Sequence, residues 1–212
     1  ASGMPRQDAE MLVKFKGTAE DRVTDLSNMA PTTGQGEVFQ YSNPMVSLAG
    51  YAAARAVEPG IPLLEAYTKV MREKVFDPLE MKTAAVRLAD ANPLKRASPH
   101  GYFMDGTPCG FDVDLDQFTE AVSPAGNGWC TVNDLAKYMQ MELNNGGSYI
   151  RPDELLERRH RLVEINRDSE YAHCLMLDRK YGIEIYGHDG GTLGFTSMMM
   201  FIPAIGIGLV IL

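Results

Sequence analysis

The chain has 212 residues, of which 45% are hydrophobic and 23% charged, so it is long enough for one globular domain and is neither disordered nor collagen-like. Its formal net charge of −8 disfavours nucleic acid as a partner, because an acidic surface repels phosphate groups. The cysteines and histidines show no spacing typical of a metal site, and no apolar run reaches the roughly 18 residues of a membrane helix. We therefore expect no metal, no cofactor and no membrane span.

Hydrophobic periodicity and helix-boundary residues predict four helices. The first covers 43–58, with Asn43 as its N-cap and a proline in its first turn. A second is expected over 62–76, a third over 131–145, and a shorter one after Pro152. The region 82–128 has scattered glycines and prolines and no clear period, so we expect long loops with short elements there.

Three strands are predicted near the end of the chain, over 181–186, 195–202 and 205–212. The last of them is apolar on both faces, and such a strand is normally covered on both sides, so we expect it to be mostly buried. The order of elements predicts an α/β (α+β) fold. A mainly helical region with long loops covers 1–180, and an incomplete antiparallel sheet covers 181–212.

Two charged runs are expected on the surface. The basic run at 158–161 follows Glu154 and Glu157, which indicates a solvated helix face of mixed charge and not a nucleic-acid site. The acidic run at 112–116 lacks the glycine and the distal glutamate of an EF-hand loop, so we expect a solvated acidic loop.

Two short clusters could carry chemistry, Tyr-Ser-Asn at 41–43 and His-Asp-Gly-Gly at 188–191. Taken alone, the first is typical of a helix start and the second of a glycine-rich turn between the strands around it. Two further stretches accompany them in order, Phe-Asp-Pro-Leu-Glu-Met at 76–81 and Ser-Pro-Ala-Gly at 123–126. The four together resemble the serine β-lactamase and penicillin-binding protein family, above all its class C, D-aminopeptidase and family VIII esterase branches, although Glu80 stands where that family usually has glycine.

The resemblance implies a β-lactamase/DD-peptidase-like fold and a serine hydrolase that transfers the acyl group of an ester, a peptide or a β-lactam. In this chemistry a serine hydroxyl attacks only after a neighbouring group takes its proton. By resemblance, Tyr41 is the expected proton shuttle, and the Asn43 amide bonds the catalytic lysine and a substrate carbonyl. The Gly191 backbone N–H is one expected oxyanion-hole donor.

Three more residues are expected to bind the substrate. By resemblance, His188 takes the place of a lysine that meets a substrate carboxylate in other branches, and Gly190 lets the substrate approach the strand closely. A histidine is charged less often than a lysine at neutral pH, which makes esters or peptides without that carboxylate plausible substrates. Ser123 begins the Ser-Pro-Ala-Gly stretch at 123–126 and is, by resemblance, expected on the substrate side of the site. The expected partner is a small-molecule acyl substrate.

The nucleophile of the family is the serine of a Ser-x-x-Lys pair, and no serine of this chain has lysine three positions later. Ser-Gly-Met-Pro at 2–5 resembles the loop that follows this pair in relatives. We therefore expect the nucleophile just upstream of Ala1, and the missing segments of the chain or a neighbouring chain as a further partner. Alternatively, the protein is a non-catalytic ligand-binding relative of the same fold. The sequence leaves the compartment open.

Overall fold

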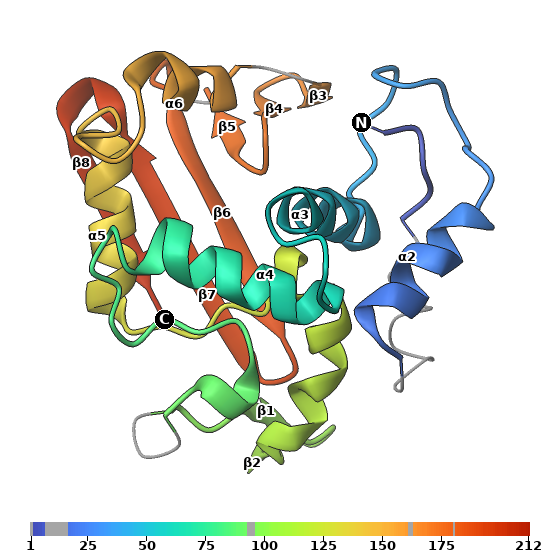
Figure 1. Ribbon diagram of the computed structural model, residues 1–212. Helices are drawn as coiled ribbons and strands as arrows, with labels where there is room; N and C mark the ends of the chain where they lie inside the picture. The colour runs from blue at the N-terminus through green and yellow to red at the C-terminus, as the bar shows by residue number, and fades with distance from the viewer. Residues whose placement is uncertain (1, 7–16, 93–95, 161–162, 180) are drawn as a thin grey trace.

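The computed structural model describes residues 2–6, 17–92, 96–160, 163–179 and 181–212, and most of its helices precede the main sheet along the chain (Figure 1). The α-helices are α2 (Ala19–Ser27), α3 (Asn43–Val57), α4 (Leu63–Met71), α5 (Val132–Leu143) and α6 (Pro152–Arg158). A π-helical turn at Arg72–Phe76 extends α4 to the end predicted for the second helix. The four predicted helices are therefore present, and α2 is a further helix that the sequence reading missed.

The helix starts follow local capping chemistry. At α5, Thr131 Oγ1 accepts a hydrogen bond of 3.3 Å from the backbone N–H of Asp134, as its sequence predicts. At α3 the prediction that Asn43 is the N-cap is wrong. The extended residue before the helix is Ser42, its side chain makes no capping bond, and Asn43 already belongs to the first turn beside Pro44.

Six antiparallel strands form the main sheet in the order β3-β4-β5-β6-β7-β8 (Figure 1). They are β3 (Val163–Asn166), β4 (Ser169–Tyr171), β5 (Met176–Asp178), β6 (Ile185–Thr192), β7 (Phe195–Ile202) and β8 (Ile207–Ile211). Each strand pairs with its neighbours in sequence, so the sheet is a simple meander. Because β3, β4 and β5 precede residue 181, the sheet begins inside the region that was expected to be mainly helical.

Strand β6 differs from the strand that the sequence predicts over 181–186. It begins at Ile185 and continues to Thr192, so the glycine-rich stretch 188–191 is part of a strand and not a turn. The chain reverses at Leu193 and Gly194 instead, between the paired residues Thr192 and Phe195. Pairing with β7 along the whole of β6 holds this stretch extended, and local glycine content does not reveal that pairing.

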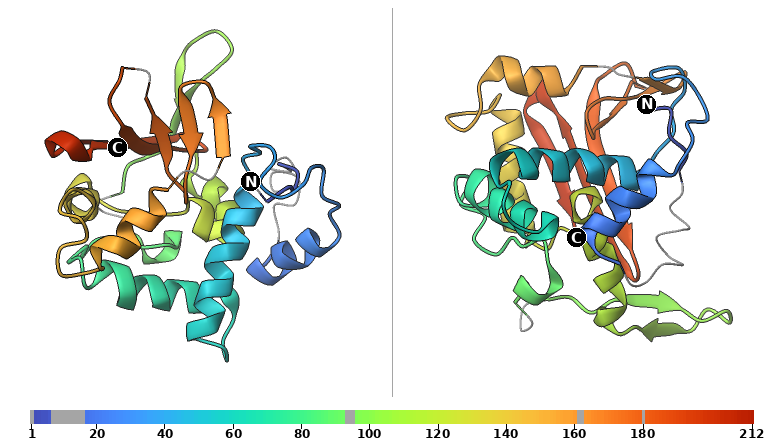
Figure 2. Two further views of the ribbon diagram at one scale, coloured as in Figure 1. Left: turned by 90° about the horizontal axis from the view of Figure 1, so that it is seen from above. Right: turned by 45° about the vertical axis from the view of Figure 1, so that its right-hand side comes forward.

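The helices lie on one side of the main sheet (Figure 2). Helix α5 packs against β7 and β8, where Met139 joins Leu177, Tyr186 and Phe201 in a buried apolar cluster. Gly208 on β8 permits this close approach, because a Cβ at that position would lie 1.9 Å from Met139 Sδ. This cluster therefore sits between α5 and one face of the sheet, and two smaller buried clusters lie around Phe76 and Tyr51.

The opposite side of β8 is open. Ile207, Leu209 and Ile211 are 58%, 50% and 52% exposed, although β8 is paired with β7 along its length. The prediction that 205–212 is mostly buried is therefore wrong for the described part of the chain. The reason is that α5 covers only one face of this strand, and an apolar sequence does not say which element will cover the other.

The basic run is buried in part, contrary to the solvated helix face expected for it. Glu142 on α5 is completely buried, and its carboxylate binds the guanidinium groups of both Arg158 and Arg159. The side chain of Arg159 is only 5% exposed, whereas His160 is surface-exposed and pairs with Glu157. An opposite charge on a different helix thus draws two of these residues inward.

Short elements fill the irregular region, as its sequence predicts. They are a 3₁₀ turn at Leu88–Asp90, the hairpin of β1 (His100–Tyr102) and β2 (Pro108–Gly110), and a 3₁₀ run at Val113–Ala125. Asp116, expected in a solvated acidic loop, is instead only 4% exposed, because this run folds against the rest of the protein. Within the described ranges, no helix combines the length and apolar character needed to cross a membrane.

Candidate functional site

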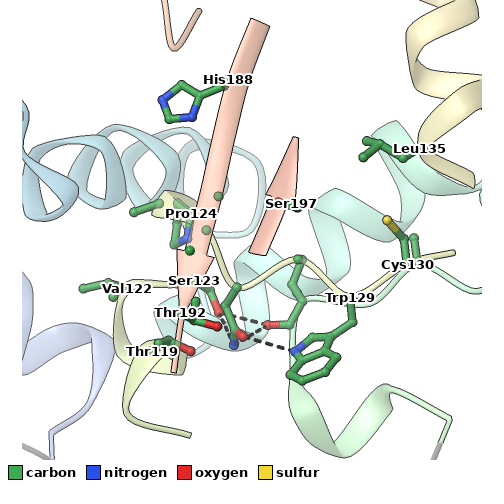
Figure 3. Close-up of a pocket in the computed structure, with 18 of the residues that line it drawn as sticks. Thr119, Val122, Ser123, Pro124, Trp129, Cys130, Leu135, His188, Thr192 and Ser197 are labelled. Carbon is green, nitrogen blue, oxygen red and sulfur yellow. Dashed lines mark hydrogen bonds between the residues drawn. The ribbon is translucent and has the colours of Figure 1, made fainter. Parts of the chain in front are cut away.

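A cavity of about 770 Å³ lies between the helices and strands β6 and β7, and Figure 3 shows Ser123 and His188 in its lining. All six residues singled out from the sequence line it. They are Tyr41, Asn43, Ser123, His188, Gly190 and Gly191. Asn43 is the first residue of α3 and Tyr41 lies just before this helix, whereas the last three come from β6. The fold therefore brings together motifs that are far apart in the sequence.

Strand β6 presents an open edge to its surroundings at the motif residues. β5 pairs with β6 only from Ile185 to Gly187, whereas β7 pairs with it as far as Thr192. Over 188–192 the strand therefore has a neighbour on one side only. Alternate residues of an antiparallel strand direct their N–H and C=O groups to the same edge, so this stretch offers backbone donors on its open side.

The two glycines of the motif meet different surroundings. A Cβ on Gly190 would lie 2.5 Å from Ser197 Oγ on β7, so the absence of a side chain lets the two strands pack as they do. A Cβ on Gly191 would meet no atom within 4 Å. A side chain at Gly190 would thus force the Ser197 hydroxyl to move, whereas Gly191 leaves open space beside its backbone.

His188 is held by two contacts with the protein. Its Nδ1 lies 2.6 Å from the backbone oxygen of Asp189, and its Nε2 lies 3.2 Å from the hydroxyl oxygen of Tyr171 on β4. The ring of Tyr41 lies beside it, with 5.9 Å between the ring centroids. Sequence reasoning missed Tyr171, because it belongs to a three-residue strand that carries no recognised motif.

Aromatic and cationic groups surround Tyr41. The Tyr171 ring meets it edge-on at 6.2 Å between centroids, and the guanidinium of Arg6 lies over it at 5.6 Å. A cation above an aromatic face is attracted by the negative charge of that face. Phe39 packs against Tyr171 with 5.2 Å between the ring centroids, which extends the aromatic cluster away from the cavity lining. Arg6 and Phe39 are thus further site residues that the sequence reading missed.

Ser123 lies in the wall of the cavity and is only 3% exposed. Its hydroxyl donates to the backbone oxygen of Val86 at 2.9 Å, and Asn127 Nδ2 donates to the same oxygen at 3.2 Å. The Trp129 indole N–H in turn donates to Asn127 Oδ1 at 3.1 Å (Figure 3). These bonds tie the hydroxyl hydrogen of Ser123 to the backbone, so this serine stabilises the shape of the wall.

Much of the remaining lining is apolar. It comes from the end of α4, the segment after it and α5, and includes Tyr67, Met71, Phe76, Met81, Val86 and Leu135. Burial raises the pKa of Tyr67 to about 12 and that of Cys130 to about 11. The Cys130 thiol therefore stays protonated at neutral pH, which makes it a poor replacement for an activated serine.

Comparisons with known proteins identify the family of the chain. The model of the family described as Beta-lactamase matches residues 1–212. The chain is 28% identical to the Unguisins hydrolase ungD′ of Aspergillus campestris, over 99% of this chain and 40% of that protein.

Solved structures show the same fold. The octameric penicillin-binding protein homologue of Pyrococcus abyssi gives a TM-score of 0.79 at 21% identity, over 98% of this chain and 48% of its own. The D-amino acid amidase of Ochrobactrum anthropi SV3 gives 0.75 at 24% identity, over 99% of this chain and 60% of its own. The chain thus spans about half the length of these relatives. With the family model matching from the first residue to the last, the chain belongs to the Beta-lactamase family.

Proposed function

We propose that this chain forms the substrate-binding wall and part of the proton-transfer machinery of a serine hydrolase of the β-lactamase and penicillin-binding type. The enzyme cleaves an ester, an amide or a β-lactam by acyl transfer, and the Ser-x-x-Lys nucleophile lies outside residues 1–212. Tyr41 relays the proton between the serine and the leaving group, while Asn43 holds the lysine and the substrate carbonyl. The Gly191 N–H stabilises the oxyanion.

The observation that carries this proposal is the meeting of Tyr41, Asn43 and the 188–191 stretch around one cavity. A reacting carbonyl needs a proton relay on one side and backbone donors on the other. Tyr41 lines the cavity with its ring 5.9 Å from that of His188, and the open edge of β6 that begins at His188 carries the proposed donors. The cavity is also lined largely by apolar side chains, which strengthens electrostatic interactions inside it by excluding water.

Amides are the substrate class that the relatives favour. One relative is a D-amino acid amidase, another is a D-stereospecific amidohydrolase, and the curated relative is named a hydrolase of unguisins. His188 fits this choice, because a neutral imidazole holds a substrate carboxylate less firmly than a lysine does. We therefore propose an uncharged acyl compound, such as an amide or an ester, as the substrate.

A non-catalytic ligand-binding protein of the same fold is the second candidate. The observation that favours it is that no serine of this chain is followed by lysine at the third position. Ser123 and Ser197 line the cavity, but the Ser123 hydroxyl is already bound to the Val86 backbone. The residues encoded upstream of Ala1 separate the two candidates, because only the enzyme needs Ser-x-x-Lys there.

The proposal is tested by covalent labelling of two proteins, residues 1–212 alone and the same chain with its natural flanking sequence. Each is incubated with a chromogenic ester or a β-lactam and analysed by intact mass spectrometry. We expect an acyl adduct only on the longer protein, at the serine of its upstream Ser-x-x-Lys. An adduct on any serine of residues 1–212 contradicts the proposed location of the nucleophile.

The role of Tyr41 is tested in the longer protein with Tyr41→Phe. Removing a proton relay should slow acylation by about 10²–10⁴-fold. The matched control is Tyr102→Phe, which removes a hydroxyl from a residue of β1 that is 75% exposed, and it should leave the rate unchanged. Equal rates for Tyr41→Phe and the wild type would remove Tyr41 from the mechanism.

A further inference from the structure

Both ring nitrogens of His188 are engaged by the protein. The backbone oxygen of Asp189 lies 2.6 Å from Nδ1 and can only accept a hydrogen bond, so Nδ1 carries the hydrogen. In the neutral ring Nε2 is then the acceptor. The hydroxyl of Tyr171, 3.2 Å away, donates its hydrogen to Nε2.

Tyr171 is well placed to remain a donor. It lies at the end of β4, packed against Phe39 at 5.2 Å and edge-on to the rings of Tyr41 and His188. Burial raises the pKa of its hydroxyl, and the neighbouring Cys174 and Tyr41 raise it further. The hydroxyl therefore keeps its hydrogen across the range in which histidines titrate.

We propose that Tyr171 is a positioning residue that fixes His188 in a form without a free N–H. With Nδ1–H bound to Asp189 and Nε2 bound to Tyr171, the neutral imidazole has no donor left for a substrate anion. It contributes only its ring to the cavity wall. The site therefore selects acyl substrates that lack a carboxylate next to the leaving group. This inference rests on the proposed function and narrows its substrate class.

Protonation changes the arrangement in one defined way. A proton taken up at Nε2 turns that nitrogen into a donor, and the Tyr171 hydroxyl must then rotate its own hydrogen away and accept. The ionisable groups around His188 are Tyr171 from β4, Tyr41 from the segment before α3, and Asp189 beside it on β6, with Arg6 over the ring of Tyr41.

The test uses the chain with its natural flanking sequence and the variant Tyr171→Phe. The substrates are a p-nitrophenyl ester and its analogue with a carboxylate on the aryl ring. In the wild type we expect kcat/KM to favour the uncharged ester. Without the Tyr171 hydroxyl, Nε2 is free to take up a proton and to donate that hydrogen to the carboxylate, so this preference should fall by about fivefold to tenfold, as expected for one hydrogen bond.

The control is Tyr186→Phe on β6, whose hydroxyl donates to Glu184 at 3.0 Å and which does not line the cavity. It should leave the preference unchanged. A structural role alone would lower kcat/KM for both esters equally in Tyr171→Phe, and that outcome overturns the proposal.

A second measurement does not depend on activity. In protein labelled with ¹⁵N-histidine, with the His188 signals assigned from His188→Gln, neutral His188 should show a protonated Nδ1 and an unprotonated Nε2. The Nε2 signal should move toward that of a nitrogen without a hydrogen bond in Tyr171→Phe. A protonated Nε2 in the neutral wild type, or an unmoved signal in the variant, refutes the positioning role. If the wild type hydrolyses neither ester but shows the expected ¹⁵N pattern, the proposed function is refuted and the positioning role of Tyr171 is not.

Discussion

Glutamine in place of Glu142 is expected to destabilise the protein by about 3–5 kcal/mol, because it leaves two guanidinium groups without their counter-ion. Glu142 has no exposed surface, and its Oε2 lies 3.0 Å from Nη2 of Arg159. Its Oε1 binds Arg158 and accepts a hydrogen bond of 3.2 Å from the Tyr138 hydroxyl. Glutamine keeps the shape of this group but removes its charge and places an NH₂ donor among other donors.

The measurement is urea unfolding of the wild type and Glu142→Gln, with thermal melting as a second probe. For a chain of this length the expected loss corresponds to a fall in Tm of roughly 6–20 °C. The control is Glu157→Gln, since Glu157 is exposed and its contact is a surface pair with His160 at 2.9 Å. That change should stay within about 0.5 kcal/mol of the wild type. A loss of stability for Glu142→Gln below about 1 kcal/mol would show that the two buried guanidinium groups do not need the Glu142 charge.

Two further changes have expected outcomes in the same unfolding assay. Gly190→Ala should lower the free energy of unfolding by about 1–3 kcal/mol, because its Cβ would stand 2.5 Å from Ser197 Oγ. Adding Ser197→Ala should restore most of this loss. The control Gly191→Ala should stay within about 0.5 kcal/mol of the wild type. Equal losses for the two glycines would contradict this packing argument. Burial opposes ionisation of Asp134, but hydrogen bonds from Thr83 outweigh it and lower the pKa of its carboxyl group. Because its pKa is lowered by folding, the Asp134 carboxylate stabilises the fold above the unfolded pKa of about 3.9, and this stabilisation is lost as the pH falls through the folded pKa. Asp134→Asn should therefore cost about 1–3 kcal/mol at pH 7 and less below about pH 4. A cost that does not change between these pH values would show that the Asp134 charge is not involved.

The sequence predicts the helices well because their boundaries are set by local chemistry. The Thr131 hydroxyl caps α5 within three residues of itself, and proline in the first turn starts α3 and α6 where expected. The prediction fails at Asn43 by one residue, because Ser42 and Asn43 are both acceptable N-caps and only the backbone angles decide between them.

Long-range partners explain what the sequence does not reveal. Arg158 and Arg159 look solvated beside Glu157, and only the packing of α6 on α5 brings them to Glu142. Tyr171 is equally hidden, because a strand of three residues has no period to detect, and its role depends on the ring of His188 two strands away. All three residues act through contacts that hydrophobic patterns do not encode.

The glycine-rich stretch 188–191 is where local reading and function conflict most directly. Glycine is unfavourable in strands, so this stretch looks like a turn, yet pairing with β7 holds it extended over its whole length. Because β5 ends opposite Gly187, the same stretch has no partner on its other edge and faces the cavity there. A bulky strand-forming residue at Gly190 would meet Ser197, and one at Gly191 would fill the space beside the backbone donors. Low strand propensity is therefore the local cost of an open strand edge that lines the cavity, and the neighbouring strand β7 supplies the stability that the glycines do not.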